Sequence, residues 1–339
     1  MPVVSTARAA SSWCRTDSGH VVPISFQWIR PMKLFRQLPV FLVVMALAGC
    51  ATSPDWEVLE EQLSERLESL DGTSGLYLRH LPTGREISIR ADSVYPTASM
   101  IKVTILAALV DRVERGELAW TEKLVYRDSL FYSDADITGE LQDGATVSLD
   151  MLARLMTSYS DNTASLWLQE LAGTGVAINA WLASEGFETT RMNSRTPGRR
   201  SDWEAYGWGQ TSPREMAQLM VMIAEGRAVS PAASDRMLRL LSGSYWDGEM
   251  LSVLPPGVEV ASKQGAVSAS KSEVVFVHAP GGAYVLCVIT NKQTDTRWAQ
   301  DNEGYVLLRD VSRLVWETLE PDYPYSPPAG ADRWAPPSE

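Results

Sequence analysis

The apolar and polar pattern after position 54 predicts a helix followed by a two-stranded hairpin. Over residues 54–70 leucines recur at helical spacing with glutamates on the opposite face, which indicates an amphipathic helix. Residues 75–79 and 86–89 then alternate with the two-residue period of strands, on either side of a Pro-Thr-Gly turn.

A mostly apolar helix is expected to begin near Ser99. Pro96 disfavours helical geometry in the residue before it, and Gly116 is a common helix stop, so the two bound this element. Ser99 and Lys102 are three residues apart and therefore lie on one face. Apolar residues recur every four positions and place one stripe against the core: Ile101, Ile105, Leu109 and Val113.

Two helices joined by a polar turn are predicted in the middle of the chain. Ser148 is a good N-terminal cap for the first, which continues to about residue 156. The second is expected over 163–171. The turn between them gathers three hydrogen-bonding side chains, and its apolar flanks suggest that it faces a cleft: Ser160, Asp161 and Asn162.

Residues 185–210 have no clear period and are expected to form a long irregular loop. A loop of this length in a compact domain is usually functional or disordered, and its tryptophans and tyrosine favour order. Ser212 and Pro213 then begin a helix, in which Glu215 is expected to complete a capping box. A further helix is predicted over 230–241.

The C-terminal part predicts three more strands and a last helix. A strand over 258–265 ends at Lys263-Gln264-Gly265, and a hairpin joins 274–278 to 283–290. An amphipathic helix follows over 302–319.

Together these elements predict an α+β domain over residues 55–320. Two N-terminal and three C-terminal strands would form one antiparallel sheet of about five strands flanked by helices. An all-helical subdomain would be inserted between the two groups of strands. The proline-rich tail, 321–339, is expected to be disordered.

The front of the chain predicts an export signal rather than part of the fold. Met32 precedes a short basic stretch and a short apolar run, as in secretory signal peptides. The run ends in Leu47-Ala48-Gly49-Cys50, which resembles a bacterial lipoprotein box, so 32–49 would be the signal and Cys50 would carry lipid. An ordinary signal peptide with a chance cysteine is the alternative. Residues 1–31 would be an upstream over-reading, and the protein would face the periplasm, anchored in the outer membrane.

Composition and net charge argue against several classes of binding partner. The 339 residues carry a net charge of −12 at pH 7, which argues against nucleic acid, since phosphate binding needs a basic face. No pair among three histidines and three cysteines has metal-ligand spacing, so we expect no metal and no cofactor. Cys14 would leave with the signal and Cys50 would carry lipid, so Cys287 remains as a small core residue. We expect a monomer.

Ser99 and Lys102 are a candidate nucleophile and base. A serine hydroxyl is a weak nucleophile until a base accepts its proton, and a lysine serves as that base when burial or a second cation lowers its pKa. A helix-capping serine and a snorkelling lysine would have the same spacing. The pair alone therefore does not establish catalysis.

Three polar motifs stand in order along the chain: Ser99-x-x-Lys102, Ser160-Asp161-Asn162 and Lys263-Gln264-Gly265. Their order and local context resemble the serine β-lactamase and penicillin-binding protein superfamily over roughly residues 55–320. The resemblance implies that Ser99 is the acylated nucleophile and that Lys102 helps to remove its proton. It also implies that Ser160 passes a proton to the leaving nitrogen. Asp161 is expected to be structural and to fix the turn.

The same resemblance implies the residues that bind substrate. Asn162 would hold the substrate amide, and Lys263 would bind the substrate carboxylate. Gln264 and Gly265 complete the third motif, in which Gln264 stands where the family usually has Thr or Ser. The backbone N–H groups of Ser99 and Ala266 would form the oxyanion hole.

The layout resembles class A, whose loop before this helix start carries a glutamate that activates the deacylating water. The position expected for this glutamate, about fifteen residues before Thr211, is occupied here by Thr196, which cannot ionise. Asp202 and Glu204 come later than expected, and Glu204 is the tentative substitute base. Slow deacylation is therefore expected.

The leading interpretation is a serine hydrolase that opens β-lactam amides through an acyl-enzyme on Ser99. A D-Ala-D-Ala peptidase acting on peptidoglycan stem peptides is the alternative, which the missing loop acid favours. A non-catalytic cell-wall-binding lipoprotein is the third, against which the intact Ser99, Lys102 and Lys263 count.

Overall fold

The computed structural model describes residues 54–331, so the predicted signal and Cys50 lie outside the described residues. Its centre is a five-stranded sheet, in the order β2-β1-β10-β9-β8, in which all neighbours are antiparallel. The N-terminal strands join the C-terminal ones directly, as predicted. The strands are β1 (Thr73–His80), β2 (Glu86–Ile89), β8 (Glu259–Val267), β9 (Ser270–His278) and β10 (Tyr284–Asn291).

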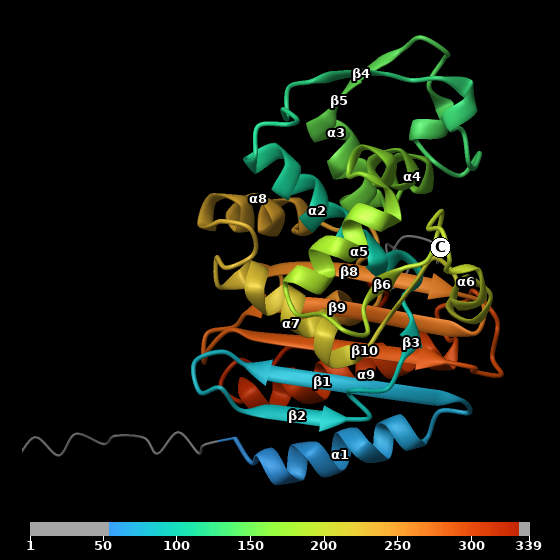
Figure 1. Cartoon of the computed structure of the whole chain (residues 1–339). Coiled ribbons are helices and arrows are strands. Elements are labelled where there is room, and N and C mark those ends of the chain that lie inside the picture. The colour runs from blue at the N-terminus through green and yellow to red at the C-terminus, as the bar shows by residue number, and fades with distance from the viewer. Residues whose placement is uncertain (1–53, 332–339) are drawn as a thin grey trace, which may run out of the picture. The chain divides into compact units, whose positions relative to one another are not determined.

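Two helices cover one face of this sheet. They are α1 (Trp56–Glu68), capped by the Asp55 side chain, and α9 (Glu303–Leu319), capped by the Asn302 side chain. In Figure 1, α9 lies behind the strands and α1 along their lower side. Their apolar sides bury one cluster with the sheet, including Leu63, Leu78, Leu286 and Trp316. Both predicted amphipathic helices are confirmed.

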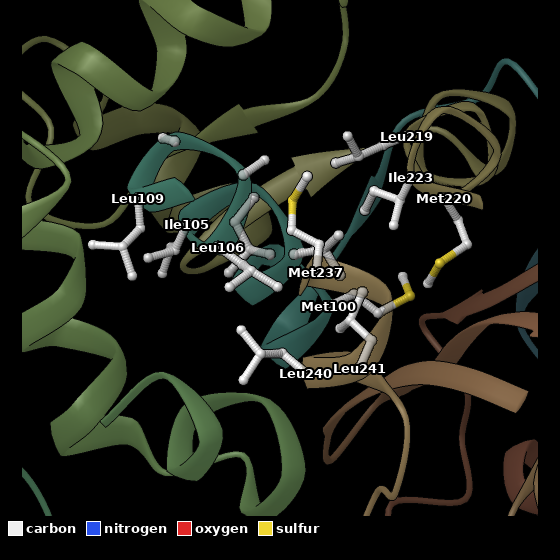
Figure 2. Close-up of a cluster of buried hydrophobic side chains, with 14 of the residues drawn as sticks. Met100, Ile105, Leu106, Leu109, Leu219, Met220, Ile223, Met237, Leu240 and Leu241 are labelled. Atoms are coloured by element: carbon white, nitrogen blue, oxygen red, sulfur yellow. The ribbon is translucent and has the colours of Figure 1, made fainter. Parts of the chain in front are cut away.

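Three helices build the core on the other face. Helix α7 (Pro213–Ala224) packs on β1, β9 and β10, α8 (Pro231–Leu241) packs on α7 and β8, and α2 (Lys102–Glu114) packs on α8. Burying a large apolar side chain contributes about 1.5–3 kcal/mol, so this cluster makes α2 a fixed platform. Figure 2 shows the side chains that meet: Met100, Ile105, Leu106, Leu109, Leu219, Met220, Ile223, Met237, Leu240 and Leu241.

A mainly helical part is inserted between the two groups of strands, as predicted. It contains α3 (Leu149–Arg154), α4 (Asn162–Leu171) and α5 (Thr174–Ser184). It is not entirely helical, because β4 (Lys123–Val125) pairs with β5 (Thr146–Ser148) in a short ribbon (Figure 1). Strands of three residues are too short to show a period in the sequence.

The segment 185–210 is more regular than expected. It contains β6 (Arg191–Met192), α6 (Arg200–Tyr206) and β7 (Gly209–Thr211), and β7 pairs with both β6 and β3 (Tyr95–Pro96). Such short elements are fixed by neighbours distant in sequence rather than by local pattern. The loop is thus tied to the residues just before Ser99.

The predicted capping box at α7 is only half formed. Ser212 Oγ accepts a hydrogen bond from Glu215 N at 3.2 Å, as expected. The Glu215 carboxylate instead accepts hydrogen bonds from the backbone N–H groups of Glu188, Thr189 and Thr190, and from Thr190 Oγ1. The side chain therefore caps the turn that leads into the loop, a long-range partner that local spacing cannot indicate.

The tail that is predicted to be disordered lies partly within the described residues. The structure describes its first part, 321–331, where Tyr323 O accepts a hydrogen bond from Trp316 Nε1 at 2.9 Å. That contact fastens the segment to α9. Residues 332–339 lie outside the described residues.

Cys287 is fully buried in β10, where burial raises the pKa of its thiol, so it behaves as a core residue. Within 54–331, no group of three or more metal-ligating side chains comes together. No helix in this part of the chain is long and apolar enough to cross a bilayer.

Candidate active site

Ser99 stands on a tight turn rather than on an α-helix. Residues Ala98–Ile101 form one 3₁₀ turn, and α2 begins at Lys102. Thr97 N donates to Gly209 O at 3.0 Å, and Met100 N donates to Thr97 O at 3.0 Å. The turn is thus held between β7 and the start of α2, with Ala98 in the left-handed region at φ 42°. The serine is presented by backbone contacts and not by its own side chain.

Gly265 allows β8 to pack directly on this turn. A Cβ added there would lie 2.4 Å from Thr97 O and 2.9 Å from Ser99 N. No side chain fits without separating the strand from the nucleophile turn. The predicted role of Gly265 is therefore better described as close backbone approach, which brings Ala266 to the cleft beside Ser99.

Lys102 connects the nucleophile to the Ser160 turn. Its side chain is 0% exposed, and Nζ donates to Ser99 Oγ at 3.1 Å, Ser160 Oγ at 3.0 Å and Asn162 Oδ1 at 2.7 Å. Ser160 O accepts a further hydrogen bond from the same nitrogen. A buried amine in contact with the serine hydroxyl is placed to accept its proton.

Ser160 lies between two lysines. One turn of π-helix, Leu155–Tyr159, ends at Ser160, which takes the left-handed conformation at φ 66°. Its Oγ accepts hydrogen bonds from Lys102 Nζ at 3.0 Å and Lys263 Nζ at 3.1 Å. Because both lone pairs are used, the hydroxyl proton is left to be donated to a third group. This arrangement suits a donor to a leaving nitrogen.

Two buried aspartates hold this turn. Asp161 Oδ1 accepts from Ala164 N and Oδ2 from Thr138 N, each at 2.7 Å. Burial raises the pKa of the Asp161 carboxyl, although these hydrogen bonds oppose the shift. Asp161 thus fixes the turn, the role implied by the sequence.

Asp136 is a residue that the sequence analysis missed. Its Oδ1 accepts from Asn162 N at 2.8 Å, and its Oδ2 accepts from Thr163 N at 2.8 Å and Thr163 Oγ1 at 2.7 Å. Thr163 Oγ1 in turn accepts from Tyr132 N at 3.2 Å. Asp136 therefore orients Asn162 and ties the segment that carries Tyr132 to α4.

Lys263 is 1% exposed, and its side chain extends to the Ser160 turn. Nζ donates to Ser160 Oγ at 3.1 Å, to Gln264 O at 3.0 Å and to Gln264 Oε1. The longer Gln264 side chain, at the departure from the family motif, therefore contacts the lysine itself.

Glu273 lies opposite Gln264 on β9 and accepts a hydrogen bond from Met250 N at 2.9 Å. Burial, with the nearby Glu249 charge, raises the pKa of Glu273 to about 8. The shift favours the neutral form of this carboxyl, although the Lys263 charge opposes it.

Ser99 opens into a cleft of about 440 Å³ with aromatic walls. Tyr132 and Trp208 meet edge to face at 5.3 Å between ring centroids, and Lys102 Nζ lies 6.0 Å from the Trp208 ring centre. Trp298 lines the cleft as well, beside Asn291. The indole of Trp208 thus occupies space close to the catalytic amine.

The structure does not bring the tentative base Glu204 to Ser99. Glu204 is exposed on α6 and pairs with Arg200 at 2.7 Å, while Asp202 pairs with Arg199 at 3.2 Å. Thr196 faces α5, since a Cβ on Gly175 would lie 1.7 Å from its Oγ1. Among residues 54–331, no aspartate or glutamate lines the cleft. Folding of 200–206 into a helix turned both loop acids outward.

Comparison with known proteins agrees with this geometry. A family model described as the beta-lactamase enzyme family matches residues 58–319. A beta-lactamase of Rhodobacter capsulatus is 26% identical over 272 residues, which cover 80% of this chain and 91% of that protein.

Solved structures agree as well. PBP-A superposes with a TM-score of 0.70 and is 28% identical, covering 78% of this chain and 97% of PBP-A; one such structure is an acyl-enzyme complex of a mutant with penicillin G. An ancestral class A beta-lactamase, GNCA, superposes with a TM-score of 0.67 and 26% identity, covering 76% of this chain and 99% of that one.

Proposed function

Since the chain belongs to the beta-lactamase enzyme family, we propose that it is a class A-like serine hydrolase that opens β-lactam amides through an acyl-enzyme on Ser99. The observation that carries this proposal is the hydrogen-bonded series from Ser99 Oγ through Lys102 Nζ to Ser160 Oγ and Lys263 Nζ. It supplies a nucleophile, a base, a proton donor and a carboxylate receptor in one buried network.

Acylation follows from these contacts. Lys102, in its neutral form, accepts the Ser99 proton as Oγ attacks the lactam carbonyl, and the carbonyl oxygen becomes an oxyanion beside the N–H groups of Ser99 and Ala266. Ser160 donates its proton to the leaving nitrogen, and Lys102 returns the Ser99 proton to Ser160. Lys263 binds the carboxylate on the leaving side. The C–N bond breaks and an ester on Ser99 remains.

The cleft offers fewer groups that could catalyse deacylation. It needs a base within hydrogen-bond reach of a water that faces the ester, and such a base typically contributes about 10²–10⁴-fold. No carboxylate among residues 54–331 lines the cleft, and the Trp208 ring lies beside Lys102. The expected behaviour is fast acylation with slow release, with Lys102 as the remaining base.

The test is to follow the protein with a chromogenic cephalosporin by absorbance and by intact mass. We expect a burst, a persistent adduct at Ser99 and a low steady rate. Ser99→Ala should form no adduct and remain folded, because backbone hydrogen bonds rather than the Ser99 side chain hold its turn. An adduct at another serine would refute the assignment. Cleavage of a D-Ala-D-Ala peptide faster than of the cephalosporin would establish the peptidase alternative.

We also propose that Cys50 carries lipid and anchors the enzyme in the outer membrane, facing the periplasm. The support is the sequence alone: a short basic and apolar stretch that ends in Leu47-Ala48-Gly49-Cys50. Cys50→Ser should release a soluble periplasmic protein. Membrane retention of that variant would point to another anchor.

A further inference from the structure

We propose that the arginine-lined hollow beside the Ser99 cleft is a subsite for a carboxylate on the acyl part of the substrate, with Arg195 as its receptor. This inference rests on the proposed acylation of Ser99 and adds a substrate class to it. It concerns the end of the substrate remote from the carboxylate that Lys263 would bind.

The hollow adjoins the cleft, because two aromatic residues line both. It has a volume of about 630 Å³, and Tyr132 and Trp208 line both it and the Ser99 cleft. The two rings form one wall, since they meet edge to face at 5.3 Å. An acyl group that extends past this wall leaves the cleft and enters the hollow.

The hollow is positively charged on a protein that is negative overall. Arg195, Arg199 and Arg200 line it, no acidic side chain does so within 54–331, and the whole chain carries −12. Arg199 pairs with Asp202 at 3.2 Å. Arg200 pairs with Glu204 at 2.7 Å.

Arg195 is the uncompensated cation of the three. Within residues 54–331 its guanidinium makes no ion pair and no hydrogen bond, and the residue is exposed. Its backbone is nevertheless fixed at φ 49°, a conformation that non-glycine residues rarely adopt. The preceding carbonyl, Ser194 O, accepts hydrogen bonds from Gln169 Nε2 at 2.6 Å and Thr196 Oγ1 at 3.0 Å. The Arg195 guanidinium therefore extends from a backbone segment that hydrogen bonds hold in place.

The chemistry of the hollow selects an anion with an apolar stem. A guanidinium presents a planar set of donors that matches a carboxylate. Trp203, whose ring centre lies 4.7 Å from the Arg200 guanidinium carbon, also lines the hollow and adds apolar surface. Both a β-lactam side chain and a peptide stem can supply a carboxylate on the acyl side, so the shared chemistry is an acyl chain that ends in a carboxylate.

The test uses two penicillins of equal length, 6-aminopenicillanic acid acylated with adipic acid or with its terminal monoamide. The second-order rate of Ser99 acylation is measured by mass spectrometry for the protein, for Arg195→Gln and for the control Arg227→Gln. Arg227 pairs with Glu225 and does not line the hollow. We expect the protein and the control to favour the carboxylate by roughly fivefold, the effect of one exposed charge pair, and Arg195→Gln to lose that preference.

Two further measurements, at high salt and with a peptide substrate, test the same subsite. At 1 M salt the Debye length is about 3 Å, so the preference should shrink in the protein and be unchanged in Arg195→Gln. The same comparison with D-Ala-D-Ala peptides that carry adipoyl or adipamoyl groups tells which substrate uses the subsite; a preference in either pair supports the proposal. Equal rates for both pairs in the protein, or a preference that survives Arg195→Gln, would overturn it. Failure of both penicillins to acylate Ser99 would instead refute the proposed function.

Discussion

Replacing Asp136 by asparagine should loosen the Ser160 turn and slow acylation. Asp136 touches neither Ser99 nor the two lysines, but its carboxylate accepts three hydrogen bonds of 2.7–2.8 Å from Asn162 and Thr163. The residue is 3% exposed. Asparagine keeps the shape and replaces one oxygen by a donor group.

The magnitude follows from which bond is lost. Keeping the amide oxygen on Thr163 preserves two contacts and turns the NH₂ group toward Asn162 N, so two donors face each other. A buried N–H left without an acceptor costs about 1–3 kcal/mol, and hydrogen bonds to charged groups are worth about 1.5–3 kcal/mol. We therefore expect Asp136→Asn to lower the free energy of unfolding by about 2–4 kcal/mol.

The functional effect should exceed the loss of folded protein. Asn162 Oδ1 accepts a hydrogen bond from Lys102 Nζ, so a shifted Asn162 misplaces both the substrate amide and the base. Urea unfolding would give the stability. Acylation of Ser99, measured well below the unfolding temperature, should be slower by roughly tenfold, since small displacements of positioning groups are costly.

Asp134 offers a matched control, since it is exposed two residues earlier and Asp134→Asn removes the same charge. That control should leave both measurements unchanged. If Asp136→Asn acylates at the normal rate while fully folded, the positioning role assigned to Asp136 is wrong.

Three further changes test other parts of the site. Lys263→Ala should slow acylation by carboxylate-bearing β-lactams by roughly 10–100-fold, the value of a charge-assisted hydrogen bond, and by less for the methyl ester; equal losses would argue against a carboxylate receptor. Burial alone would raise the pKa of Glu215, but hydrogen bonds from Thr190, Thr189 and Glu188 hold it below its ordinary value. Glu215→Gln should therefore destabilise the protein above about pH 4.5, with the difference from the parent shrinking as pH falls through the lowered pKa; a constant difference would contradict this linkage. Glu204→Gln should leave the lifetime of the acyl-enzyme unchanged, and a longer lifetime would show that α6 unfolds to bring the acid to Ser99.

The sheet and the motif residues could be predicted because their signals are local. Strand alternation in 75–79 and 86–89, and the cap and stop signals around the helices, are short-range patterns that survive folding. The spacing of Ser99 and Lys102 needs only one helical turn to bring the two side chains together. That both groups of strands share one sheet was predicted, but their order, β2-β1-β10-β9-β8, was not.

Asp136 and the loop could not be predicted because their partners are distant in sequence. Asp136 lies in a stretch without a period and acts on residues 26 and 27 positions later. Glu215 reaches back to the turn at 188–190 instead of to Ser212. Counting back from Thr211 found Thr196 but could not show that its hydroxyl faces α5.

The two halves of the proposed reaction rest on elements of different kinds, so deacylation should be open to change without loss of acylation. The acylation groups sit on the Ser99 turn, the Ser160 turn and β8, and each is held by buried contacts: Gly265 against the turn, Asp136 under Asn162, and the α2 core. A change in any of these disturbs folding as well as chemistry. The loop that carries the deacylating acid in class A enzymes lies here at the surface, where α6 holds its two acids in arginine pairs. Arg195 stands on the same loop beside the cleft, so a change there would alter the proposed carboxylate subsite without disturbing the acylation groups.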